Sequence, residues 1–117
     1  DPNSVFKTLV TEGKSKEHYV IVVPVLCELD LKKAAAAVGE KSIAMIKSKE
    51  LLPTTGYIHG GCSPIGMKKQ FKTVIDESAL LQNRIYFSGG RLGLQIETTL
   101  QGLQLAIEVQ TADLCCN

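Results

Sequence analysis

The sequence predicts a mixed α/β (α+β) domain in which a mixed or curled β-sheet carries a few helices. Stretches rich in β-branched residues outnumber stretches with helical signals, and several neighbouring β-like stretches are joined by short connections. The chain has 117 residues, of which 44% are apolar and 21% are charged, and this composition is typical of a folded domain. We therefore expect residues 1–117 to form a single domain.

Two strands are predicted near the start of the chain. Residues 6–10 favour a first strand, and the β-branched run 19–25 favours a second strand that is buried on both faces. Pro24 lacks a backbone donor, so it should lie at a sheet edge, at a bulge or near a strand end.

Helical signals follow the second strand. Asp30 is a suitable N-cap for a helix over residues 31–38. After a short strand near residues 43–45, Ser48 is a suitable cap for a brief helix that Pro53 should end.

The second half of the chain predicts three more strands and a last helix. The strands are expected near residues 72–75, 85–88 and 93–97. The helix should cover residues 99–106, with Thr98 as its cap.

Charge and hydropathy restrict the partners of the chain. Lys and Arg number 13 against 12 Asp and Glu, so a net charge of +1 cannot attract nucleic acid to the whole molecule, and any basic surface must be local. No apolar run reaches the roughly 18–20 residues that cross a bilayer, and no secretory leader opens the sequence. We therefore expect a cytoplasmic protein without a membrane partner.

The cysteines are expected to be reduced thiols. They are Cys27, Cys62, Cys115 and Cys116, which is a low density for a disulfide scaffold and contains no C-x-x-C pair. Their spacing relative to the two histidines, His18 and His59, favours no metal site. We expect neither a metal nor a cofactor.

Two glycine pairs, Gly60-Gly61 and Gly89-Gly90, each follow a β-like stretch. Such pairs either form tight turns or let backbone N–H groups approach a ligand closely, as in oxyanion holes. No nucleotide-binding glycine motif occurs, and His59 has no evident nucleophile partner. Cys62 is better explained as a small packing residue than as a nucleophile.

Lysines at two places have both a structural and a functional interpretation. Lys7 lies inside the apolar run 5–10, where it either protects a sheet edge against aggregation or places a cation at a pocket wall. A short basic cluster, Lys68, Lys69 and Lys72, is either a solvated face or a contact for nucleic-acid phosphates.

Four segments follow one another along the chain: FKTL at 6–9, LDLKKAA at 29–35, GYIHGGCSPIG at 56–66 and YFSGGRLGL at 86–94. Together they resemble the signatures of the YbaK/EbsC family of aminoacyl-tRNA deacylases, which is related to the editing insertion of bacterial prolyl-tRNA synthetase. The resemblance implies a small barrel-like mixed sheet with peripheral helices that binds the aminoacylated 3′ end of tRNA. It also implies that this chain lacks the N-terminal segment that relatives carry ahead of the first signature.

The resemblance further implies trans-editing removal of cysteine from tRNA(Pro), with prolyl-tRNA synthetase as a partner. The substrate's own thiol is expected to attack its ester carbonyl, so that no protein nucleophile is needed. Lys7 and Gly60 take the family's catalytic positions, and backbone donors of Gly60 and Gly61 are expected to face the carbonyl oxygen. The remaining assignments are Gly61, Ser63, Ser88, Gly89 and Gln95 for substrate binding, and Lys68 and Lys69 for tRNA binding.

Two other functions remain open from the sequence. One is deacylation of Ala-tRNA(Pro), which needs a water nucleophile and a pocket sized for a methyl side chain. The other is a tRNA-binding module without turnover.

Overall fold

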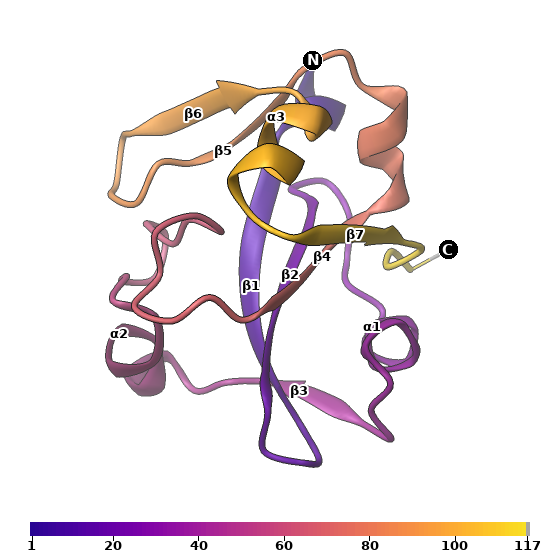
Figure 1. Ribbon diagram of the computed structural model, residues 1–117, viewed down its shortest axis with the longest axis vertical. Helices are drawn as coiled ribbons and strands as arrows, with labels where there is room; N and C mark the ends of the chain where they lie inside the picture. Colours follow the sequence, from indigo (N-terminus) through magenta and orange to yellow (C-terminus); the bar gives the residue numbers. More distant parts are fainter. Residues whose placement is uncertain (117) are drawn as a thin grey trace.

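The computed structural model describes residues 1–116 and shows a mixed five-stranded sheet with helices on both faces (Figure 1). In spatial order the strands are β3 (Ile43–Met45), β1 (Phe6–Gly13), β2 (His18–Pro24), β4 (Lys72–Asp76) and β7 (Val109–Ala112). β1 is antiparallel to β2 and β3, whereas the β2–β4 and β4–β7 pairs are parallel. The predicted mixed sheet is therefore confirmed.

A second, two-stranded sheet stands beside the first. It is an antiparallel hairpin of β5 (Ile85–Ser88) and β6 (Gln95–Thr98). One isolated parallel bridge, Val5 to Tyr86, connects β5 to the residue that precedes β1.

Helices cover both faces of the larger sheet. They are α1 (Leu31–Val38), α2 (Ser48–Thr55) and α3 (Leu100–Ala106), with short 3-10 helices η1 (Pro2–Ser4) and η2 (Glu77–Leu81). Among the described residues, no helix is long and apolar enough to cross a membrane.

The alternation of side chains along β2 divides the core into two clusters. Ile21 and Val23 pack with α1, whereas Val20 and Val22 pack with residues of α2, α3 and β5 on the opposite face. All four side chains are fully buried, as predicted for this strand. Pro24 is its last residue, which is one of the positions expected for a proline.

The helix over 31–38 is confirmed together with its cap. The Asp30 carboxylate accepts hydrogen bonds from the N–H groups of Lys32 and Lys33, which have no partner inside the helix. Gly39 ends the helix in the left-handed conformation, at φ +77°.

The expected boundaries of the other helices were wrong. Ser48 is the first residue of α2 rather than its cap, and the helix continues beyond Pro53 to Thr55. Proline removes only one backbone hydrogen bond, and the Thr55 hydroxyl, which donates to the Leu51 carbonyl at 2.8 Å, helps to hold the last turn. The N-cap of α3 is Thr99 instead of Thr98.

Two strand predictions also differ from the structure. The strand expected near 93–97 is β6 at 95–98, because the Gly89 N–H donates to the Leu94 carbonyl and keeps residues 90–94 in the turn. β7 was not predicted. It is short, and its place in the sheet depends on parallel pairing with β4, which lies far away in the sequence.

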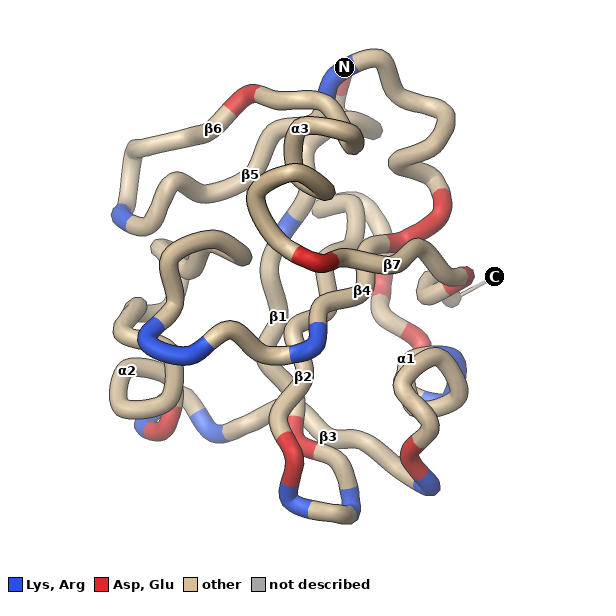
Figure 2. The backbone as a smooth tube through the Cα atoms, viewed as in Figure 1, with Lys and Arg blue, Asp and Glu red and all other residues tan. Residues whose placement is uncertain are grey.

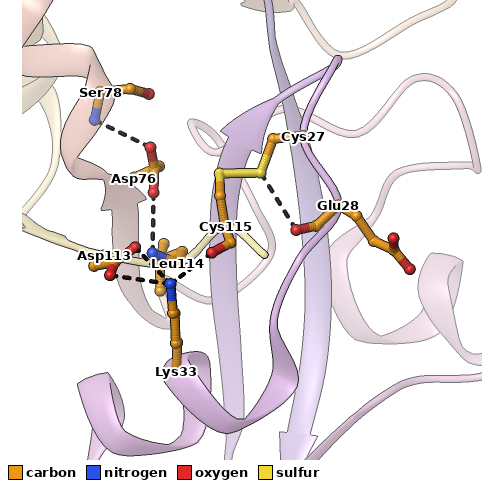
Figure 3. The surroundings of a disulfide bond; sticks show 8 residues. All are labelled: Cys27, Glu28, Lys33, Asp76, Ser78, Asp113, Leu114 and Cys115. Carbon is orange, nitrogen blue, oxygen red and sulfur yellow. Dashed lines mark hydrogen bonds and ion pairs between the residues drawn. A yellow bond between two sulfur atoms is a disulfide. The ribbon is translucent and has the colours of Figure 1, made fainter. Parts of the chain in front are cut away.

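The prediction of four reduced thiols is wrong for one pair, because Cys27 and Cys115 form a disulfide across 88 residues of sequence (Figure 3). The chain near Cys115 pairs with the chain that follows Cys27. The Asp30 N–H donates to the Leu114 carbonyl, and the Cys116 N–H donates to the Glu28 carbonyl. This pairing brings the two cysteines together, and it could not be read from their spacing.

Side chains fix the same C-terminal segment (Figure 3). The Lys33 ammonium lies 3.1 Å from the Asp113 carboxylate and donates to the Cys115 carbonyl. The buried Asp76 carboxylate accepts the N–H groups of Leu114 and Ser78.

Candidate functional site

A cavity of about 540 Å³ opens along one edge of β1. Its walls come from β1, from the segment that joins β3 to α2, from the glycine-rich loop after α2 and from the end of β5. The residues that line it are Phe6, Lys7, Thr8, Leu9, Val10, Met45, Ile46, Lys47, Ser48, Leu51, His59, Gly60, Cys62 and Ser88. Three of the residues predicted for the site therefore line one cavity, namely Lys7, Gly60 and Ser88.

The cavity exists because β1 has no neighbouring strand over part of this edge. The Val5 carbonyl accepts from the Val25 N–H on the β2 side, and hydrogen-bonded pairs alternate along an antiparallel ladder. Phe6, Thr8 and Val10 therefore turn their backbone groups to the other edge. At that edge β3 pairs only with residues 11–13, and the Ile46 N–H donates to the Val10 carbonyl. β5 approaches the same edge through a single bridge, from Tyr86 to Val5.

Lys7 lies in this gap. It is partly buried, and its ammonium forms no hydrogen bond or ion pair with residues 1–116. The open stretch of sheet edge beside Lys7 is itself a wall of the cavity, and the role of the lysine there stays a prediction. Lys7 and Lys47 are the cations of the lining, which contains no Asp or Glu, so the cavity favours an anion or a developing negative charge.

The first glycine pair contacts the turn that follows the second pair, and of these four glycines only Gly60 lines the cavity. A Cβ on Gly60, which has φ +83°, would lie 3.0 Å from Leu92 Cδ2, and a Cβ on Gly61 would lie 3.1 Å from the Cα of Arg91. The loop after α2 therefore packs directly on the turn of the β5–β6 hairpin. The Gly60 N–H has no partner among the described residues, whereas the Gly61 N–H donates to the Ile58 carbonyl at 3.0 Å. The expectation that the Gly61 N–H faces the cavity was therefore wrong, because this N–H is already bonded within its own loop.

Tyr57 joins the same two loops and was not identified from the sequence. Its hydroxyl donates to the Ile65 carbonyl at 2.6 Å. Cβ atoms placed on Gly66 and on Gly90 would each come within 2.9 Å of the Tyr57 side chain, and both glycines have positive φ. These glycines therefore make room for an aromatic ring between the loops.

The other predicted substrate-binding residues do not line the cavity. Ser63 is buried, and its hydroxyl accepts from the Ile65 N–H within the glycine-rich loop. The Gly89 N–H closes the hairpin turn, and Gln95 is exposed on β6 opposite Ser88. Ser63 and Gly89 therefore form hydrogen bonds within the loops beside the cavity, and Gln95 lies on the neighbouring strand.

Lys68 and Lys69 are exposed outside the cavity, on the segment that leads to β4. The Lys69 ammonium lies 5.7 Å from the centroid of the Phe71 ring, at cation–π distance. Neither lysine has an acidic partner among the residues described.

Cys62 is not a nucleophile in this structure. Burial raises the pKa of its thiol to about 11, so the thiol stays protonated at neutral pH. Among residues 1–116, no cluster of three or more His, Cys, Asp or Glu side chains is arranged to hold a metal ion.

Comparison with known proteins identifies the family of this chain. The sequence model of one protein family, the aminoacyl-tRNA editing domain, matches residues 1–105 of this chain. An Enterococcus faecalis protein, EbsC, which carries the provisional name of a Cys-tRNA(Pro)/Cys-tRNA(Cys) deacylase, is 47% identical over 110 residues, or 94% of this chain and 67% of that protein.

Solved structures agree with this assignment. One described provisionally as a trans-editing enzyme for prolyl-tRNA synthetase superposes with a TM-score of 0.89 at 26% identity, covering 100% of this chain and 73% of the other. A scaffold protein used for computational epitope grafting superposes with a TM-score of 0.92 at 26% identity, covering 100% and 74%. The chain therefore belongs to the aminoacyl-tRNA editing domain family.

Proposed function

We propose that the chain is a trans-editing deacylase that removes mischarged cysteine from tRNA(Pro). The observation that carries this proposal is the cavity at the open edge of β1. It combines the unpaired ammonium of Lys7, the free N–H of Gly60 and the hydroxyl of Ser88, and it holds no activated protein nucleophile. Such a site suits a substrate that brings its own nucleophile.

In the reaction, the thiol sulfur of the esterified cysteine attacks the ester carbonyl carbon. The bond between that carbon and the terminal ribose oxygen breaks, the ribose oxygen takes the thiol proton, and the products are a thiolactone and free tRNA. Negative charge develops on the carbonyl oxygen during the attack. The Gly60 N–H and the Lys7 ammonium stabilise that charge, and Ser88 positions the acyl group.

Charge on the cavity side of the molecule supports tRNA as the carrier of the ester. Basic segments gather around α2, before β4 and at the turn between β5 and β6 (Figure 2). They include Lys47, Lys49, Lys68, Lys69 and Arg91. The net charge of only +1 gives weak attraction over the whole molecule, so prolyl-tRNA synthetase in the cytoplasm is the proposed partner that delivers the tRNA.

The central test is single-turnover deacylation of Cys-tRNA(Pro) by Lys7→Ala. Losing one charge-stabilising group should lower the rate about a hundredfold. Lys41→Ala removes an exposed lysine that does not line the cavity and should leave the rate unchanged. Equal rates for Lys7→Ala and the parent would remove Lys7 from the mechanism.

Substrate variants test the nucleophile. S-methylcysteinyl-tRNA(Pro), Ala-tRNA(Pro) and Pro-tRNA(Pro) should all resist cleavage, because none has a free thiol. Cleavage of the first two at the rate of Cys-tRNA(Pro) would show a water-dependent deacylase instead. Binding of charged tRNA without any cleavage would show a binding module.

A further inference from the structure

The cavity beside β1 has a buried interior and an exposed mouth. Part of its lining belongs to the hydrophobic core and is buried, namely Phe6, Val10, Leu51 and Cys62. The lining residues that are exposed to solvent are Met45, Lys47, Ser48, His59 and Gly60. They come from two segments, the end of β3 with the chain that leads to α2, and the glycine-rich loop after α2. The cavity therefore opens to solvent along these two segments.

The cavity is larger than the acyl group that reacts in it. Its volume of about 540 Å³ lies in the range of roughly 300–1,000 Å³ that holds a whole small-molecule ligand, and a cysteinyl group fills only a small part of it. The tRNA body has to stay in solvent, so the acyl group points inward and the terminal nucleoside lies at the mouth. In the proposed reaction the ester carbonyl faces Gly60, which is itself exposed, and the ribose is bonded directly to that ester. The adenine base therefore comes within reach of the side chains around Gly60.

His59 places an unpaired aromatic ring at this mouth. It precedes Gly60, so the two Cα atoms are about 3.8 Å apart. The His59 imidazole is exposed and forms no hydrogen bond, ion pair or ring contact with residues 1–116. The ring of His18, by contrast, lies 3.5 Å from the Glu12 carboxylate, and the other aromatic ring of the lining, Phe6, is buried in the core. Histidine is one of the side chains on which proteins stack unpaired bases.

Met45 supplies an apolar surface at the same mouth from the other segment. Its side chain is 47% exposed although it lines the cavity. A thioether is polarisable and makes favourable contacts with aromatic rings. Lys47 is exposed in the same segment and has no acidic partner among the described residues, so it provides a cation for the phosphate of the nucleotide. The mouth thus combines an aromatic ring, a thioether and a cation, which suit the base and the phosphate of one nucleotide.

We propose that Met45 and His59 form a binding subsite for the adenine base at the 3′ end of the tRNA. The identity of the ligand rests on the proposed deacylase function. Contact with the base holds the ester against Gly60 and Lys7, and such positioning lowers the entropic cost of reaching the transition state. Stacking tolerates different bases because every base has a π-face, so the subsite responds to the presence of a base more than to its kind. It adds affinity that the small acyl group cannot supply.

Two uncleavable probes test the subsite by NMR chemical-shift titration, which follows weak binding as well as tight binding. The first is 3′-deoxy-3′-(cysteinylamino)adenosine, an amide analogue of the aminoacylated tRNA end, and the second is the same compound with hydrogen in place of the base. The parent should bind the first probe more tightly than the second. Met45→Ala and His59→Ala should each weaken the first probe about tenfold, the scale of one stacking contact, and leave the second unchanged. His59→Phe should retain the affinity of the parent, because it keeps an aromatic ring.

Leu52→Ala is the matched control for Met45→Ala, since Leu52 is 51% exposed but does not line the cavity. It should leave the affinity of both probes unchanged. Unchanged binding of the second probe shows that Met45→Ala and His59→Ala keep the cavity intact. The proposal is overturned if the parent binds the two probes equally or binds neither. It is also overturned if either alanine variant spares the first probe or weakens both alike, or if His59→Phe loses as much affinity as His59→Ala.

Deacylation of Cys-tRNA(Pro) by the parent separates the failure of the subsite from the failure of the deacylase function. A parent that cleaves this substrate but binds both probes equally refutes the subsite and leaves the deacylase function standing. A parent that prefers the first probe, and loses that preference in both alanine variants, but cleaves no Cys-tRNA(Pro) refutes the deacylase function and leaves the subsite standing.

Discussion

At the scale of single residues, the protonated thiol of Cys62 predicts how this cysteine reacts. Burial raises its pKa to about 11, whereas Cys116 is exposed. The thiolate is the form of cysteine that reacts with iodoacetamide. At pH 8, iodoacetamide should therefore modify Cys116 while Cys62 remains unmodified. The Cys62 rate should keep rising toward pH 11. A Cys62 rate that levels off near pH 8.5 would contradict the assigned pKa.

The same pKa has a consequence for stability, with a definite sign. The thiol binds its proton more tightly in the folded chain than in the unfolded chain, whose pKa is near 9. Stability from this group is complete below pH 9 and is lost as the pH rises toward 11. Cys62→Ala should flatten that part of the stability curve, as measured by urea unfolding between pH 8 and 11.

Single residues also show what sequence reasoning could find in the site. Lys7 was identifiable because a cation inside an apolar strand pattern is a local anomaly. The open edge of β1 that forms a wall of the cavity carries no such signal in the sequence. It arises from where β3 and β5 stop pairing with β1, which is a property of tertiary structure.

At the scale of elements, Tyr57 and Gly90 hold the glycine-rich loop against the β5–β6 hairpin. Gly90 has φ +106°, and a Cβ there would lie 2.9 Å from Tyr57 Cε1. Gly90→Ala should destabilise the protein by about 3 kcal/mol, through backbone strain and displacement of the ring, and should also lower deacylation because Gly60 loses its support.

Gly93→Ala is the matched control for this contact. Gly93 also has positive φ, at +80°, but a Cβ there meets nothing within 4 Å. Gly93→Ala should lower the free energy of unfolding by only about 1 kcal/mol, as measured in urea, and should leave deacylation unchanged. Equal losses for the two variants would show that Tyr57 does not depend on the space at Gly90.

Elements with strong local signals were predictable, and those set by distant partners were not. Asp30 and a buried β-branched run were enough to locate α1 and β2. The last turn of α2 contains an additional hydrogen bond, from the Thr55 hydroxyl to the Leu51 carbonyl, and the position of β7 depends on parallel pairing with β4. Propensity alone cannot register either effect.

At the scale of the whole molecule, the Cys27–Cys115 bond ties the C-terminal segment to the chain before α1 (Figure 3). A link across 88 residues restricts the unfolded chain strongly. By loop entropy it should add about 4 to 5 kcal/mol to the free energy of unfolding. Reductant should therefore lower the urea midpoint, and Cys27→Ser should do so without reductant.

Cys116→Ser is the control for this bond, because Cys116 is a free thiol next to Cys115. It should unfold like the parent and keep the response to reductant. Alkylation of Cys27 and Cys115 in the native protein under oxidising conditions would refute the bond. Since glutathione keeps most cytosolic thiols reduced, the stability that the bond adds depends on the redox state of the compartment.

The distribution of charge over the molecule predicts how tRNA binding responds to salt. Lys68 and Lys69 belong to the segment before β4, and basic segments gather there, around α2 and at the turn between β5 and β6, whereas more of the acidic segments lie toward α1 and the C-terminus (Figure 2). Each phosphate contact releases bound counterions, so removing both lysines should reduce the slope of log affinity against log salt by about 1.5. The affinity should fall most at low salt. Filter binding of aminoacylated tRNA from 50 to 300 mM salt measures both effects.

The exposed lysines Lys32 and Lys41 provide the control, because they lie on α1 and just after it, away from the cavity lining. Replacing both with alanine changes the net charge by the same amount as replacing Lys68 and Lys69. If tRNA responds only to total charge, the two double variants will show the same slope, and the assignment of Lys68 and Lys69 fails. If tRNA contacts the surface that carries Lys68 and Lys69, only the double variant Lys68→Ala, Lys69→Ala will show a smaller slope of log affinity against log salt. In that case the acceptor end is directed to the cavity by a local basic surface, which a net charge of +1 would otherwise conceal.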